Sequence, residues 1–108
     1  EAVLTLREQY PEITLEIAIP HDGQTAKWPQ SLRDRAERIR EEADVITWIA
    51  HEYTKRCLFD RNYYMVSHCS VLLACFDGQH GGTAQTIETA HRLGRLITVV
   101  RSVRRKVA

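Results

Sequence analysis

The sequence lacks the features that would tie the protein to a membrane or to nucleic acid. No stretch of its 108 residues is apolar over the roughly 20 residues that a membrane-spanning helix needs, and no signal peptide is visible. Charge of one sign is not in excess either, because the formal net charge is +1 at pH 7. Composition therefore predicts no general electrostatic attraction to nucleic acid or to a lipid surface.

Cysteine is scarce and follows no metal-binding spacing. The three cysteines, Cys57, Cys69 and Cys75, are odd in number and form no CxxC pair. We interpret all three as reduced, buried thiols of a cytoplasmic protein. His68 precedes Cys69, but adjacent residues on a helix point about 100° apart, which is a poor geometry for chelation. No metal and no cofactor is predicted.

The common catalytic patterns are missing too. No Ser–His–Asp order stands out, no pair of carboxylates is placed for acid–base work, and the GxGxxG fingerprint and the P-loop are both absent. Repeats and low-complexity tracts are also missing, so the length fits a single domain with one modest core.

What is present is a regular alternation of helices and strands. Apolar segments at 13–20, 44–49, 71–76 and 96–100 are typical of strands, and helical patterns precede, separate and connect them. This order predicts a three-layer α/β/α sandwich with a mainly parallel sheet of about four strands. We expect one domain over residues 1–101. Residues 102–108 form a basic tail, which we interpret as a solvated terminus.

A glycine-rich segment, FDGQHGGTAQTIETA at 76–90, follows the most apolar predicted strand. In an open α/β sheet ligands bind beyond the carboxyl ends of the strands, and this segment leaves such an end. Gly81 and Gly82 have no Cβ, so the backbone can approach a ligand closely. Thr83 begins a helix whose free N–H groups favour an anion such as phosphate. The alternative is a tight turn with Thr83 as the helix N-cap.

Further candidates follow the other strands. Arg61 could hold a phosphate with a two-pronged contact, and Asn62 could recognise a ribose hydroxyl or a base edge. Alternatively, Arg61 pairs with Asp60 or Asp77 and Asn62 caps a turn. Asp77 could bind a hydroxyl or begin an Asx turn. Trp28 could stack on a base, although we favour a role in plugging the gap between its loop and the next helix.

Two of these segments carry a specific resemblance. IAIPHDGQTAKWP, followed by DRNYYMVSHCSVLLACFDGQHGGTAQTIETAHRLGRLI, resembles the YpsA-like branch of the SLOG superfamily over about residues 1–101. That superfamily also contains the DNA-processing protein DprA and the LOG cytokinin-activating proteins. The resemblance implies a Rossmann-like fold that binds nucleotides or nucleotide-derived ligands such as ADP-ribose. The ligand-binding residues that it and the loop chemistry imply are Arg61, Asn62, Asp77, Gly78, Gly81, Gly82 and Thr83.

The resemblance to LOG proteins is incomplete at the positions that cleave an N-glycosidic bond. Arg61 and Met65 match the LOG pattern, but Asn62 replaces its lysine. Thr86 stands where LOG enzymes have a catalytic glutamate, and Glu88 comes two residues later, which turns it about 200° around a helix. We therefore expect binding of a nucleotide-like ligand without robust catalysis. The alternatives are a LOG-type N-glycosidase and a DprA-like binder of single-stranded DNA, which the net charge of +1 disfavours.

Members of the YpsA-like branch normally begin with two strands that precede the segment seen here. The sequence thus resembles a fragment, and the two further strands would lie in the middle of the sheet and supply half of the nucleotide pocket. Because a monomer without them would expose apolar surface, we expect self-association into a homo-oligomer.

Overall fold

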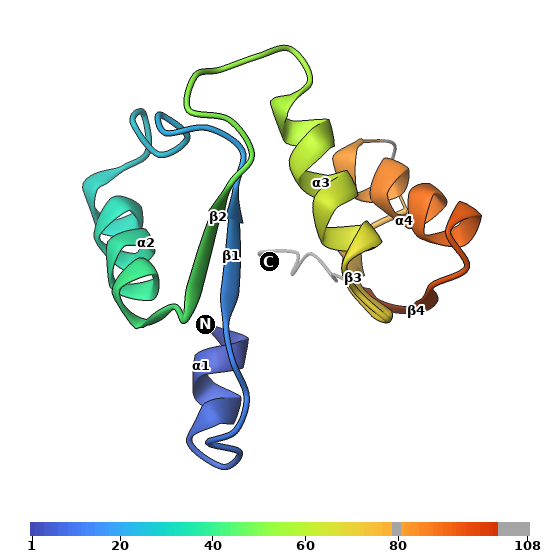
Figure 1. The fold of residues 1–108 in the computed structure, drawn as a ribbon, viewed down its shortest axis with the longest axis horizontal. Helices are drawn as coiled ribbons and strands as arrows, with labels where there is room; N and C mark the ends of the chain where they lie inside the picture. The colour runs from blue at the N-terminus through green and yellow to red at the C-terminus, as the bar shows by residue number, and fades with distance from the viewer. Residues whose placement is uncertain (79–80, 102–108) are drawn as a thin grey trace, which may run out of the picture. The chain divides into compact units, whose positions relative to one another are not determined.

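The computed structural model describes residues 1–78 and 81–101, and the predicted alternation of helices and strands is confirmed there (Figure 1). The basic tail at 102–108 lies outside the described residues. The elements follow the order α1 (Ala2–Arg7), β1 (Glu16–Ile19), α2 (Gln30–Glu42), β2 (Val45–Trp48), α3 (Cys57–Ser67), β3 (Val71–Phe76), α4 (Gly82–Arg92) and β4 (Leu96–Arg101). The protein therefore has a mixed α/β fold with parallel strands.

The strands pair in a different way from the expected single sheet of about four strands. β1 bonds only to β2 and β3 only to β4, so the described residues form two parallel two-stranded sheets. Each strand has thus paired with its neighbour across one connecting helix. A single sheet would need hydrogen bonds between a strand of one pair and a strand of the other, and none of the described strands makes such bonds.

The chain divides accordingly into two compact units, and the boundary between them along the sequence lies within α3, between Arg61 and Asn62. In the first unit, residues 1–61, a single carboxylate ties α1 to the start of the β1–β2 pair. Oδ2 of Asp44 accepts a hydrogen bond from the Leu15 N–H at 2.7 Å and lies 3.0 Å from Nη1 of Arg7. Beyond that point the strands run in register from Glu16 beside Val45 to Ile19 beside Trp48. Their carboxyl ends consequently lie next to each other.

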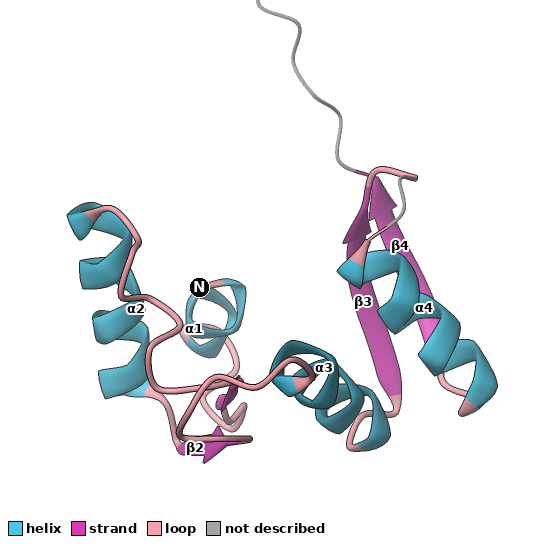
Figure 2. Cartoon of the chain, turned by 90° about the horizontal axis from the view of Figure 1, so that it is seen from above, coloured by secondary structure: helices cyan, strands magenta, loops and turns pink. Residues whose placement is uncertain are grey.

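In the second unit, which begins at Asn62, α4 packs against both β3 and β4 (Figure 2). Ala74 of β3 and Ala90 of α4 are both buried, as expected where a helix approaches a sheet closely. The unit's other fully buried apolar side chain is Val66 of α3. The helix–sheet contact covers one face of the β3–β4 pair.

The other face of the β3–β4 pair is apolar and exposed. Side chains alternate along a strand, and partners in register point the same way, so Leu73 shares this face with Thr98. Leu73 is 72% exposed, and Leu96 on the same face is 70% exposed. The face comprises Val71, Leu73, Cys75, Leu96, Thr98 and Val100. Parallel sheets are normally covered on both faces, so this surface favours association.

We propose that the exposed β3–β4 face is where the chain self-associates with a second copy, since it carries no charge that would repel an identical face. We expect Leu73→Lys to lower the average mass measured by sedimentation equilibrium toward that of a monomer. Leu6→Lys, at an exposed position of α1, is the matched control and should leave the mass unchanged. A wild-type chain that stays monomeric at the highest concentration tested would contradict the proposal.

Candidate functional site

The glycine-rich loop begins directly after β3 and needs glycine for its backbone conformation. Asp77 and Gly78 follow Phe76 and are exposed, whereas Gln79 and His80 lie outside the described residues. Gly78 has φ of +90° and Gly81 has φ of +153°, conformations that side-chain-bearing residues rarely adopt. A Cβ at either position would meet nothing within 4 Å. These two positions therefore favour glycine because of their backbone conformation and not because a side chain would clash with its neighbours.

Helix α4 starts at Gly82, and its N-cap is Gly81, so the alternative in which Thr83 caps the helix is wrong. Gly81 has no side chain with which to accept a hydrogen bond from the first turn. The first hydrogen bond of the helix runs from the Gln85 N–H to the Gly81 carbonyl at 3.1 Å. The N–H groups of residues 82–84 therefore have no partner carbonyl within the helix. These donors and the positive end of the helix dipole together suit an anion.

Asn62 lies against the start of α4. A Cβ built on Gly82 would sit 3.9 Å from Nδ2 of the Asn62 side chain, so a residue of α3 meets the first residue of α4 within the second unit. The amide is half-buried. Two of the residues predicted to bind a ligand, far apart in the sequence, are thus brought together, and a group with both donor and acceptor stands beside the helix terminus.

Arg61 directly precedes Asn62 on α3 and is half-buried. Burial lowers the pKa of its guanidinium, and the side chain of Cys57, one helical turn earlier, acts in the opposite direction. Arginine nevertheless stays charged at neutral pH, because its ordinary pKa is so high. Asp60, considered above as a possible partner of Arg61, has Oδ1 at 3.9 Å from Nε of Arg56.

The position at which LOG enzymes carry their glutamate has a different role here. Oγ1 of Thr86 donates a hydrogen bond to the Gly82 carbonyl at 2.8 Å, within the first turns of α4. Glu88 is exposed two residues further along the helix. The hydroxyl of Thr86 therefore serves the helix backbone.

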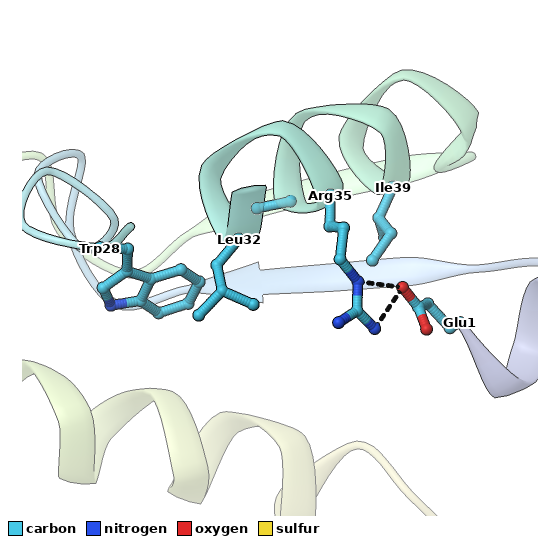
Figure 3. Close-up of a pocket in the computed structure, with 6 residues that line it drawn as sticks. Glu1, Trp28, Leu32, Arg35 and Ile39 are labelled. Atoms are coloured by element: carbon cyan, nitrogen blue, oxygen red, sulfur yellow. Dashed lines mark hydrogen bonds and ion pairs between the residues drawn. The ribbon is translucent and has the colours of Figure 1, made fainter. Parts of the chain in front are cut away.

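Trp28 is 42% exposed and lines a pocket in the first unit together with residues of α2 (Figure 3). The pocket has a volume of about 410 Å³ and extends along the apolar stripe of α2. In this pocket, Nη2 of Arg35 lies 2.6 Å from Oε1 of Glu1. The hydrogen bond from Arg35 is the main cause of the lowered pKa of the Glu1 carboxyl. The lining residues are Glu1, Trp28, Leu32, Arg35, Ala36 and Ile39.

A group that sequence reasoning missed lies at the carboxyl ends of β1 and β2. It combines Asp22 and His21 after β1 with Trp48, His51 and Tyr53 at and after β2. The signal that could have found it is the position of these residues, all of which come at or just after the end of a predicted strand.

The described residues contain neither a membrane-spanning helix nor a cluster of metal ligands. Over residues 1–78 and 81–101, no helix is long and apolar enough to cross a membrane. In the same part of the chain, no three His, Cys, Asp or Glu side chains gather in a way that could hold a metal ion.

The fold and the glycine loop define an α/β protein in which a helix without a side-chain cap follows a parallel strand. Comparison with known families narrows this class, because residues 1–93 match the model of the YspA SLOG family, designated YpsA. The chain belongs to this family, as its sequence motifs predicted. One family model thus spans residues of both compact units.

Curated relatives carry names that state no function. A UPF0398 protein of Staphylococcus haemolyticus is 29% identical over 85 residues, which is 77% of this chain and 46% of that protein. A UPF0398 protein of Bacillus pumilus is 28% identical over 85 residues, with the same shares covered. The chain therefore spans about half the length of the curated relatives it matches.

Proposed function

We propose that the chain is a binding domain for a nucleotide or nucleotide-derived ligand, held mainly through a phosphate group. The observation that carries the proposal is the start of α4, which has no side-chain cap and lies beside the Asn62 amide, since a Cβ built on Gly82 would sit 3.9 Å from Nδ2 of Asn62. Membership of a SLOG family supports a nucleotide-related ligand.

Each residue of the site has a role that its chemistry permits. The N–H groups of Gly82 and Thr83 would donate to phosphate oxygens, and hydrogen bonds to a charged group contribute about 1.5–3 kcal/mol each. The Arg61 guanidinium has the geometry for a bidentate contact with a phosphate group. Asn62 would recognise a ribose hydroxyl or a base edge. Asp77, directly before Gly78, would accept a hydrogen bond from a ribose hydroxyl.

The proposed role is binding without cleavage of the N-glycosidic bond. Such cleavage in LOG enzymes depends on a glutamate at the position of Thr86, and the Thr86 hydroxyl here donates to the Gly82 carbonyl. Binding of single-stranded DNA is disfavoured by the net charge of +1, because that activity relies on neutralising phosphates. We further propose that the domain acts in the cytoplasm, where its three free cysteines would stay reduced.

Thermal-shift measurements with AMP, ADP and ADP-ribose test this function. We expect at least one of them to raise Tm with concentration, because a ligand at 100 times its Kd stabilises the folded state by about 2.7 kcal/mol. The shift should exceed that of adenosine, which lacks the phosphate. If no phosphorylated ligand outperforms its dephosphorylated counterpart, the proposed phosphate site is wrong.

A further inference from the structure

The carboxyl ends of β1 and β2 carry a second cluster of side chains, entirely within the first unit. Ile19 and Trp48 end their strands side by side in register. The residues that follow each strand therefore share one edge of the sheet, which is the edge where ligands bind in open parallel sheets.

Two contacts tie the loops together at this edge. Nδ1 of His51 lies 3.3 Å from Oδ1 of Asp22, and the Asp22 N–H donates to the His51 carbonyl at 3.2 Å. In the tautomer that carries its proton on Nδ1, His51 donates to the Asp22 carboxylate. In the neutral ring, Nε2 is then an acceptor, and its orientation is held by the Asp22 contact.

Aromatic rings also lie at this edge of the sheet. Trp48 and His51 have stacked rings with centroids 6.5 Å apart and planes inclined by 29°, while His21 meets Tyr53 edge to face at 5.4 Å. Trp48 is 43% exposed, Tyr53 is 66% exposed and the His51 side chain is 79% exposed. The edge thus presents accessible aromatic surface next to an oriented ring nitrogen.

The stability of the fold does not account for this arrangement. An exposed ion pair contributes a median of about 0–1 kcal/mol, and Tyr53, which is 66% exposed, keeps most of its surface in water. By contrast, stacking of a base on an aromatic side chain contributes about 1–3 kcal/mol, and every nucleobase offers such a face. The cluster is therefore better suited to a ligand than to packing.

We propose that Asp22, Trp48, His51 and Tyr53 form a binding site for a planar heteroaromatic ring, namely the base of a nucleoside. The ring stacks on Trp48 or Tyr53. Nε2 of His51 accepts a hydrogen bond from an exocyclic amine of the base, and Asp22 positions the imidazole. This site requires no phosphate and stands independently of the proposed function at Gly82.

Fluorescence provides a direct test because the chain has only two tryptophans. In a Trp28→Phe variant, Trp48 is the sole tryptophan reporter, and we expect adenosine to quench it along a saturable curve. In the converse Trp48→Phe variant, where Trp28 reports, quenching should be weak and linear in adenosine concentration. Uridine, which lacks an exocyclic amine, should bind at least fivefold more weakly than adenosine or cytidine.

Variants of the histidines separate the proposed contact from a structural role. In the Trp28→Phe background, His51→Ala should weaken adenosine binding at least fivefold with an unchanged Tm, because the side chain is exposed. Asp22→Asn should have a smaller effect in the same direction. His91→Ala, at an exposed position of α4, is the matched control and should leave the curve unaltered.

Three outcomes would overturn the proposal. One is linear quenching in the Trp28→Phe variant. Another is loss of the adenosine signal on Gly82→Val, which would assign the nucleoside to the phosphate site. The third is binding of a single-stranded oligonucleotide with steep salt dependence while adenosine fails to bind, which would replace the nucleoside by a nucleic acid. Saturable binding of adenosine that Gly82→Val leaves intact supports the site, even if no phosphate ligand binds elsewhere.

Discussion

The Gly82→Val variant is expected to lose binding of phosphorylated nucleotides by about 100-fold or more while remaining folded, a loss of about 2.7 kcal/mol in binding free energy. Gly82 begins α4, and in the proposed site its missing side chain leaves room for an oxygen anion beside the N–H groups of the first turn. Gly82→Ala should show a smaller loss of the same sign. Isothermal titration with AMP or ADP-ribose measures both effects.

The structure indicates that the fold will accept these changes. A Cβ at Gly82 would lie 3.9 Å from Nδ2 of Asn62, which is an ordinary van der Waals contact, and no unusual φ restricts the position. Alanine is also the better helix former, so Gly82→Ala should preserve or slightly raise Tm. A fall in affinity would therefore reflect the blocked approach and not unfolding.

Gly94→Ala is the matched control at the other end of the same helix. Gly94 has φ of +70°, and a Cβ there meets nothing within 4 Å. Alanine in this conformation costs about 1–2 kcal/mol, so we expect a lower Tm with unchanged affinity. If Gly82→Ala and Gly94→Ala reduce affinity equally, the start of α4 has no special role in binding.

The second large effect is expected for Arg61→Ala, which should weaken binding of the same ligands about 100-fold. The Arg61 guanidinium is half-buried, and its planar fork can hold a phosphate through two parallel hydrogen bonds. Arg61→Lys keeps the positive charge without the bidentate geometry, and we expect it to recover only part of the affinity. Competition binding against a fluorescent ADP-ribose derivative would rank the three proteins.

Arg56→Ala tests whether any positive charge near Arg61 in the sequence contributes to the binding of phosphorylated ligands. The Arg56 side chain is 74% exposed, and its Nε lies 3.9 Å from Asp60, so its removal should change neither Tm nor affinity appreciably. An Arg61→Ala protein that binds AMP and ADP-ribose as the wild type does would remove Arg61 from the site. A protein that loses affinity equally on Arg56→Ala would indicate general electrostatic attraction instead.

The identity and order of the elements could be predicted from the sequence because they depend on local patterns. The apolar run at 71–76 coincides with β3, and Gly94 does follow the end of α4. Boundaries were less predictable. Asp60, which resembles an N-cap, lies in the first turn of α3, because the apolar residues before it also adopt helical geometry and the Asp60 N–H donates to the Arg56 carbonyl.

Strand pairing and long-range contacts could not be predicted, since they depend on tertiary structure. The sequence indicates that β1, β2, β3 and β4 are parallel but not which strands share a ladder. The approach of Asn62 to Gly82 and the contact between Asp22 and His51 each join residues far apart in the chain. The second contact follows only from the register that places Ile19 beside Trp48.

The most direct test is to follow backbone amide signals by ¹H–¹⁵N NMR while AMP is added to the full chain. A phosphate held at the start of α4 should shift the amide signals of Gly82 and Thr83 along a saturable curve and leave that of Gly94 in place. If those two signals stay fixed at saturating AMP, no anion is held at this helix terminus.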